Sequence, residues 1–244
     1  MTTDWPYPRW IAHRGAGKLA PENTLAAFKL GASHGYRMFE CDVKLSSDGV
    51  PFLLHDETLD RTTNGHGVAG LLDWQALQKF DAGSWHSPEY VGERLPSLDT
   101  IAKYCITNGL DLNIEIKPTP GTEKITGKVV AEHVARMWQN ESRKPLLTSF
   151  QPDALQGALD AAPDIPRGAL LNKLWSVWLE TSLMLGCQAV IFDYPLWDAR
   201  TMLQAKSAGF KTLSFTVNDE AEVQRLLALG IDGFITDRVD AFKP

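Results

Sequence analysis

The feature that most constrains the fold of this 244-residue chain is a regular alternation of short apolar segments with amphipathic helical patterns. The predicted strands are 10–14, 38–45, 110–117, 146–150, 167–171, 189–194, 211–217 and 233–237. The predicted helices are 24–34, 97–107, 122–139, 152–161, 175–185, 198–208 and 219–229. Eight strands with intervening helices in this length favour a closed α/β architecture, the (β/α)8 or TIM barrel, over a doubly wound open sheet. We predict one barrel domain over residues 1–244.

The last helical pattern, residues 219–229, has a boundary signal at each end. It carries apolar residues on one face, and Asn218 precedes it as the expected N-cap. Gly230 follows it and is expected to end the helix.

One stretch, residues 56–97, breaks the alternation after the second strand. It contains turn-rich sequence, one short helical pattern and a glycine-containing loop. A connection between a strand and a helix usually takes about 2–6 residues. Because such loops build the active face of a barrel, we interpret this insertion as a functional cap rather than a decorative subdomain. Trp85 and His86 within it are expected to reach the bound molecule.

The overall charge bears on possible partners. The formal net charge of −6 gives no general attraction to nucleic acid or to an anionic membrane surface.

Residues 1–10 lack the basic and apolar regions of a signal peptide, and no apolar run is long enough for a membrane helix. Cys41, Cys105 and Cys187 have no metal-binding spacing and are expected to be reduced core residues. We therefore expect a cytoplasmic protein without membrane insertion, and the sequence leaves its oligomeric state open.

Two of the predicted strands carry charge on one face only. In MFECDVKL, Glu40, Asp42 and Lys44 alternate with apolar residues, and in LDLNIEIK, Glu115 and Lys117 do the same. If the apolar faces pack against the helices, these charges point into the barrel, where unpaired charge is costly. An internal layer of salt bridges would explain the charges alone. We favour a binding site, because histidines join them.

The residue types at this site indicate phosphate ester chemistry. Glu40, Asp42 and Glu115 offer hard oxygen ligands, which suit Mg²⁺ or Ca²⁺ better than Zn²⁺. His13 and His55 stand at the ends of extended segments and can exchange protons near neutral pH. The cations among these groups can receive an anionic phosphate. They are Arg14 and Lys117.

The motifs occur in an order that resembles the glycerophosphodiester phosphodiesterase family. They are HRG at 13–15, PENT at 21–24, ExD at 40–42, HD at 55–56, TLDRTTNGHG at 58–67, DAGSW at 81–85, LPSL at 95–98, ExK at 115–117, TVND at 216–219 and DGFITD at 232–237. The resemblance covers nearly the whole chain and is greatest to the bacterial cytosolic form. Glu22 or Asn23 in PENT is expected to hold the first loop by hydrogen bonds. Phe215 stands where family members often carry tryptophan, which affects the pocket wall.

The resemblance implies a TIM-barrel hydrolase that splits small-molecule glycerophosphodiesters into sn-glycerol 3-phosphate and an alcohol. It implies that His13 and His55 are the acid–base pair and that Arg14 and Lys117 hold the phosphate. A divalent cation would be bound by the three carboxylates. Mg²⁺ and Ca²⁺ are the first candidates for that cation, and Mn²⁺ and Co²⁺ are further ones.

Three alternatives remain at this point. A phosphatidylinositol phospholipase C-like enzyme and a sphingomyelinase D-like enzyme share a similar barrel and paired histidines. Both act at membranes, and this acidic chain shows no apolar or basic membrane-binding stretch. A non-catalytic barrel that only binds a phosphodiester is the third. Loss of a histidine or carboxylate would favour it, but all seven candidate residues are present.

Overall fold

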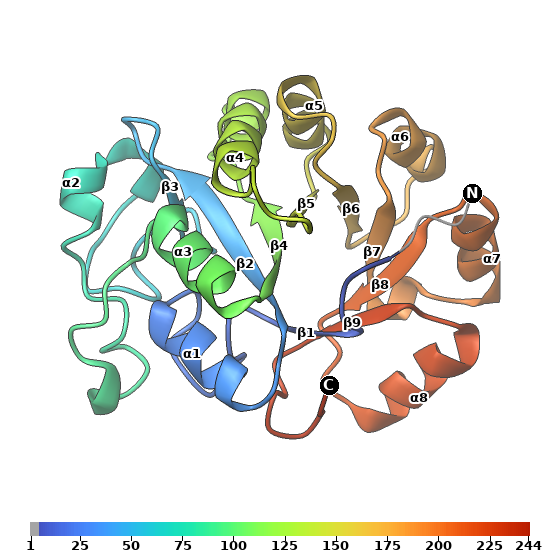
Figure 1. Cartoon of the computed structure of the whole chain (residues 1–244), viewed down its shortest axis with the longest axis horizontal. Coiled ribbons are helices and arrows are strands. Elements are labelled where there is room, and N and C mark those ends of the chain that lie inside the picture. The colour runs from blue at the N-terminus through green and yellow to red at the C-terminus, as the bar shows by residue number, and fades with distance from the viewer. Residues whose placement is uncertain (1–4) are drawn as a thin grey trace.

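The computed structural model of the chain describes residues 5–244 and contains a closed parallel barrel ringed by helices (Figure 1). The barrel strands are β1 (Trp10–Ala12), β2 (Met38–Leu45), β4 (Asp111–Ile116), β5 (Leu146–Ser149), β6 (Arg167–Leu171), β7 (Ala189–Asp193), β8 (Lys211–Phe215) and β9 (Gly233–Thr236). Strand β1 pairs in parallel with β9 on one side and with β2 on the other, which closes the sheet. The predicted α/β barrel is confirmed, and the open sheet is excluded. Residues 1–4 of the segment inspected for a signal peptide lie outside the described residues.

The helices follow the predicted order. They are α1 (Leu25–Ser33), α3 (Leu98–Asn108), α4 (Glu123–Met137), α5 (Pro152–Ala161), α6 (Trp178–Met184), α7 (Ala199–Ser207) and α8 (Glu220–Leu229). The predicted N-cap of α8 is wrong, because the Asp219 side chain accepts the backbone N–H groups of Ala221 and Glu222. The Asn218 side chain is instead bonded to Asp237, directly after β9.

Alternation along β2 separates the two sides of the barrel wall. Phe39, Cys41 and Val43 pack in the apolar cluster beneath the helices, as predicted. Met38 lies on the opposite side, in a cluster contributed mainly by the barrel strands. Its buried members fill the barrel interior with apolar side chains, as is usual for this fold. They are Tyr7, Ile11, Met38, Leu146, Leu170, Ala189, Ile191, Leu213 and Ile235. The charged residues of β2 follow Met38 toward the carboxyl end of the strand.

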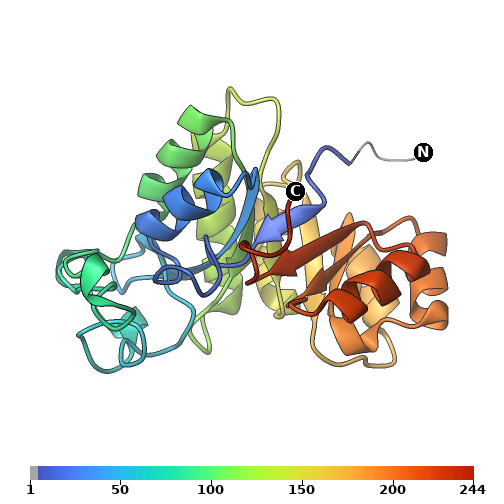
Figure 2. The same ribbon diagram turned by 90° about the horizontal axis from the view of Figure 1, so that it is seen from below.

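The segment between β2 and α3 adds a short strand and a small apolar cluster. Strand β3 (Pro51–Leu53) pairs antiparallel with the end of β2. After it come η1 (Ala69–Leu71), α2 (Trp74–Leu77) and η2 (Pro88–Tyr90), so the helical pattern in this region forms only one α-helical turn. Figure 2 shows this segment at the edge of the molecule.

Two further expectations concern the chain's environment. All three cysteines are buried free thiols, as predicted. Within residues 5–244, the helices are too short or too polar to span a membrane.

Candidate active site

The structure brings all seven candidate residues together at the carboxyl end of the barrel. Six of them line one cavity of about 150 Å³. They are His13, Arg14, Glu40, His55, Glu115 and Lys117. Asp42 is fully buried beside this cavity. Phe150 and Phe215 form part of its wall and pack edge to face, with ring centroids 5.5 Å apart. The cavity therefore joins a polar side to an apolar side, as expected for a small organic phosphate.

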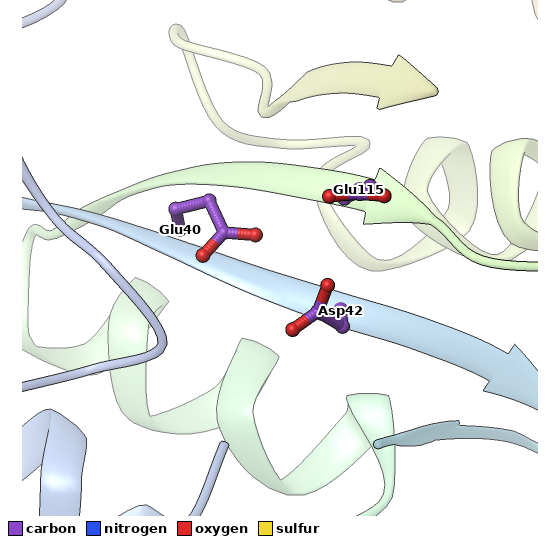
Figure 3. A group of neighbouring side chains, drawn as sticks. All are labelled: Glu40, Asp42 and Glu115. Carbon is purple, nitrogen blue, oxygen red and sulfur yellow. The ribbon is translucent and has the colours of Figure 1, made fainter. Parts of the chain in front are cut away.

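Three carboxylates converge at this site from two adjacent strands (Figure 3). Glu40 and Asp42 stand on β2 and Glu115 on β4, and their nearest ligand atoms all lie within 4.8 Å of one another. Pairing of Asp42 with Glu115 across the two strands sets this proximity. The buried Oδ1 atom of Asp42 accepts no hydrogen bond within residues 5–244. Hard oxygen donors crowded in this way, one of them unsatisfied, fit a divalent cation such as Mg²⁺ or Ca²⁺.

The same crowding changes the proton affinities of the carboxyl groups. Burial raises the pKa of Glu40 well above its usual range, and the charges of Asp42 and Glu115 raise it further. Burial and Asp42 likewise raise the pKa of Glu115 to about 7. Burial acts in the same direction on Asp42, but Arg14 and Lys117 more than offset it and lower its pKa to about 2. Without a cation, Glu40 and Glu115 thus tend to be protonated, which reduces the negative charge of the cluster.

Two cations lie against the carboxylates and also face the cavity. The Arg14 Nε atom is 3.2 Å from Asp42 Oδ2, and the Lys117 Nζ atom is 3.1 Å from Glu115 Oε1. Burial lowers the pKa of Lys117, but Glu115 and Asp42 outweigh that effect and raise it, so its ammonium is charged. The salt bridges of the alternative interpretation are therefore present. Because three carboxylates meet two cations that remain accessible from the cavity, pairing alone does not account for the site.

Each candidate histidine is held by a carboxylate through the same ring nitrogen. His13 Nδ1 lies 2.6 Å from Asp237 Oδ1, and His55 Nδ1 lies 2.7 Å from Asp56 Oδ1. An Nδ1–H that donates to a carboxylate leaves Nε2 free to accept or donate a proton in the cavity. Burial lowers the pKa of His55, and the positive charges of Arg14 and Lys117 lower it further. The neutral form of this imidazole is therefore favoured.

The first loop holds its functional residues in an uncommon backbone conformation. Arg14 and Asn23 have positive φ angles of 51° and 59°. Such conformations cost on the order of 1–3 kcal/mol in residues other than glycine, and Asn tolerates them best. The Arg14 N–H donates to Glu40 Oε2, and its carbonyl accepts the Asn23 N–H. At Gly17, a Cβ atom would lie 2.1 Å from the Asp237 carbonyl oxygen, so only glycine fits there.

A network of ion pairs extends from this loop into the segment after β3. Arg61 donates to both carboxylate oxygens of Glu22 and to both of Asp56. Glu22 also accepts from Arg14 Nη1 at 2.8 Å, and Asp56 holds His55. Arg61 therefore links Arg14, through Glu22, to His55, through Asp56. The expected role of the PENT segment is also seen, since Asn23 bonds both the side chain and the backbone N–H of Asp42.

The roles of Asp56, Arg61 and Asp237 were not predicted from the sequence. Asp56 and Asp237 each had a local signal, since one follows His55 directly and the other follows the last strand. The pairing of Asp237 with His13 spans 224 positions in the chain, which no local pattern reveals. Trp85 and His86 behave differently from expectation, because neither lines the cavity. The His86 Nε2 atom instead lies 3.1 Å from the Lys18 carbonyl oxygen.

Comparisons with known proteins identify the family. The glycerophosphoryl diester phosphodiesterase family matches residues 13–241. The chain belongs to this family. The glycerophosphodiester phosphodiesterase of Caldanaerobacter subterraneus subsp. tengcongensis is 32% identical over 232 residues, which cover 93% of each chain. That of Bacillus subtilis is 28% identical over 250 residues, which cover 95% of this chain and 84% of the relative.

A solved structure of a family member supports the same conclusion. An Oleispira antarctica phosphodiesterase, solved in complex with the product sn-glycerol-3-phosphate, is 35% identical and has a TM-score of 0.88. The match covers 94% of this chain and 93% of that chain. The prediction of a phosphodiesterase of this family is thereby confirmed.

The raised carboxyl pKa values predict how a divalent cation affects stability as pH changes. Because Glu40 and Glu115 bind protons more tightly in the folded metal-free protein than when unfolded, their contribution to its stability falls as pH rises from about 4.5 through 7. A cation must displace these protons, so it binds more weakly at low pH. Saturating Mg²⁺ or Ca²⁺ should therefore raise the melting temperature more at about pH 8 than at about pH 5.5.

Differential scanning fluorimetry after chelation and metal addition measures this effect. Glu40→Gln should abolish most of the metal-induced shift, whereas Glu180→Gln, an exposed carboxylate on α6, should retain it. A shift that is independent of pH and unaffected by Glu40→Gln would show that the cation binds elsewhere.

Proposed function

We propose that this cavity hydrolyses glycerophosphodiesters, the deacylated forms of phospholipids, to sn-glycerol 3-phosphate and an alcohol. The observation that carries the proposal is the convergence on one cavity of two carboxylate-anchored histidines, two cations and three clustered carboxylates. The product bound by the Oleispira antarctica relative supports the choice of substrate. We further propose that residues 1–244 form one catalytic barrel domain, in which the segment over 56–97 braces the site through Arg61.

The carboxylates are proposed to hold one divalent cation, either Mg²⁺ or Ca²⁺, with Mn²⁺ and Co²⁺ as further candidates. Glu40, Asp42 and Glu115 would be its protein ligands. When bound, the cation would offset the negative charge of the carboxylates and of the substrate phosphate, and stabilise charge that develops during the reaction. This role follows from electrostatics, since a phosphodiester would otherwise enter a pocket that already contains three acidic groups.

Arg14 and Lys117 are proposed to bind the non-bridging phosphate oxygens. Both lie at the edge of the carboxylate group and line the cavity. The guanidinium plane of Arg14 can grip two oxygens at once, whereas the Lys117 ammonium acts as a compact charge. The aromatic wall formed by Phe150 and Phe215 suits the carbon atoms of the glycerol unit.

The two histidines are proposed to move the protons of the reaction. One Nε2 takes the proton of the glycerol 2-hydroxyl while its oxygen bonds to phosphorus. The bond from phosphorus to the alcohol oxygen breaks, and the other histidine donates a proton to that oxygen. Water then opens the resulting cyclic phosphate with the proton transfers reversed. Asp237 and Asp56 fix the ring orientations and stabilise each imidazolium while it exists.

Turnover of a glycerophosphodiester with identification of both products tests the proposed function. Wild-type protein with a divalent cation should release sn-glycerol 3-phosphate and the free alcohol. His13→Ala and His55→Ala should each lower kcat by about 10²-fold or more, since each removes a proton-transfer group. Both variants should keep the metal-induced rise in melting temperature. His34→Ala, at the exposed C-cap of α1, is the matched control and should retain full activity. Full activity in either cavity variant would contradict the assignment.

A substrate analogue distinguishes the cyclic route from direct attack by water. A glycerophosphodiester that lacks the 2-hydroxyl should bind as a competitive inhibitor but turn over extremely slowly, because it has no internal nucleophile. Steady-state kinetics with the natural and deoxy substrates make the comparison. Hydrolysis of the deoxy analogue at a near-normal rate would mean that water attacks phosphorus directly.

A further inference from the structure

A second cavity of about 200 Å³ adjoins the proposed active site. The two cavities share Glu115, Lys117 and Phe150 in their linings. The second one lies among the carboxyl ends of β2, β4 and β5 and the beginning of α4. Lys117, which is proposed to hold the phosphate, therefore stands at the boundary between the two spaces.

The distinctive group in the second cavity is the ammonium of Lys44. Lys44 is only 3% exposed, yet it lines this cavity and not the first. Its Nζ atom donates to the Lys117 carbonyl oxygen at 3.3 Å, and it forms no ion pair with a carboxylate within residues 5–244. By contrast, Lys117 itself pairs with Glu115 and Asp42. An ammonium has three donors, so the buried charge of Lys44 retains capacity for a further oxygen acceptor.

The remaining lining is polar and mixed in charge, with the carboxylates of Glu115 and Glu123 beside the lysines, and it offers little aromatic surface. Gln151 stands at the exposed rim, and its side-chain amide makes no hydrogen bond within residues 5–244. Phe150 is the one aromatic residue of the lining, and Lys117 already lies over its ring, with Nζ 5.9 Å from the centroid. A trimethylammonium group is typically bound by several aromatic faces, which this cavity does not offer.

We propose that this cavity is the head-group subsite and that Lys44 hydrogen-bonds an oxygen of the departing alcohol. The inference rests on the proposed function, since it concerns the arm of the diester that leaves. It assigns the preferred substrate class as glycerophosphodiesters whose head group carries hydroxyl or carboxylate oxygens, such as glycerol, inositol or serine. Choline, which offers neither, is the disfavoured head group. Lys44 acts here as a specificity-determining residue and takes no part in proton transfer.

The test compares kcat/KM for four substrates: the glycerol, inositol, serine and choline diesters of sn-glycerol 3-phosphate. Wild-type protein should favour the first three over the choline diester by about tenfold, roughly the effect of one charge-assisted hydrogen bond. Lys44→Met, which keeps the length of the side chain, should remove this preference by lowering the first three values. The choline value should stay within about twofold. Lys103→Met, on the exposed face of α3, is the matched control and should change none of them.

Several outcomes separate this inference from the function on which it rests. If the wild-type protein hydrolyses none of the four diesters, the proposed function fails and the subsite with it. If it hydrolyses all four but Lys44→Met lowers every value equally, or none, only the subsite is overturned. Melting curves check that the variant folds. If Lys44→Met does not fold, the preference of the wild-type protein tests the subsite by itself. Equal kcat/KM values for the choline and inositol diesters would then overturn the subsite. If only the serine diester is preferred, the head-group atom that Lys44 binds is a carboxylate oxygen. If the glycerol and inositol diesters are preferred as well, it is a hydroxyl oxygen.

Discussion

The crowding of three carboxylates inside the barrel is the constraint on which the rest of the site depends. Glu40, Asp42 and Glu115 are buried, and their ligand atoms lie within 4.8 Å of one another. Like charges at this distance in a poorly solvated space repel strongly, so the fold must supply compensation. Arg14 and Lys117 supply part of it as direct ion partners. The remainder is left to protons or to a bound cation, which is the condition that a metal-dependent site requires.

Hydrogen bonds from the first loop hold the carboxylates and Arg14 in place. Arg14 keeps a left-handed backbone conformation because its N–H donates to Glu40 and its carbonyl accepts from Asn23. Asn23 in turn bonds Asp42, so the first loop and the second strand fix each other. Arg61 extends the bracing outward to the segment after β3. A chain of net charge −6 thereby keeps two cations, Arg14 and Lys117, in the lining of the cavity that is proposed to receive a phosphate.

Sequence reasoning predicted the barrel and its charged strands because both depend on local periodicity. The alternation of Glu40 and Asp42 with apolar neighbours on β2 reports the inward face directly. The carboxylate partners of the histidines could not be found in this way, since Asp237 meets His13 only when the last strand closes against the first. The N-cap of α8 was misplaced for a similar reason, because a distant partner, Asp237, engages Asn218. Local sequence patterns therefore predict the helices and strands, whereas contacts between distant residues, such as His13 and Asp237, form only when the barrel closes.

Anomalous diffraction from crystals soaked in Mn²⁺ tests the proposed metal site directly, because it locates the cation independently of activity. We expect a strong peak among the carboxylate oxygens of Glu40, Asp42 and Glu115, and loss of that peak in Glu40→Gln crystals soaked under the same conditions. Manganese suits such oxygen ligands and scatters anomalously where Mg²⁺ does not. Crystals that show ordered Mn²⁺ elsewhere, with no peak among these three carboxylates, would show that they do not form the metal site.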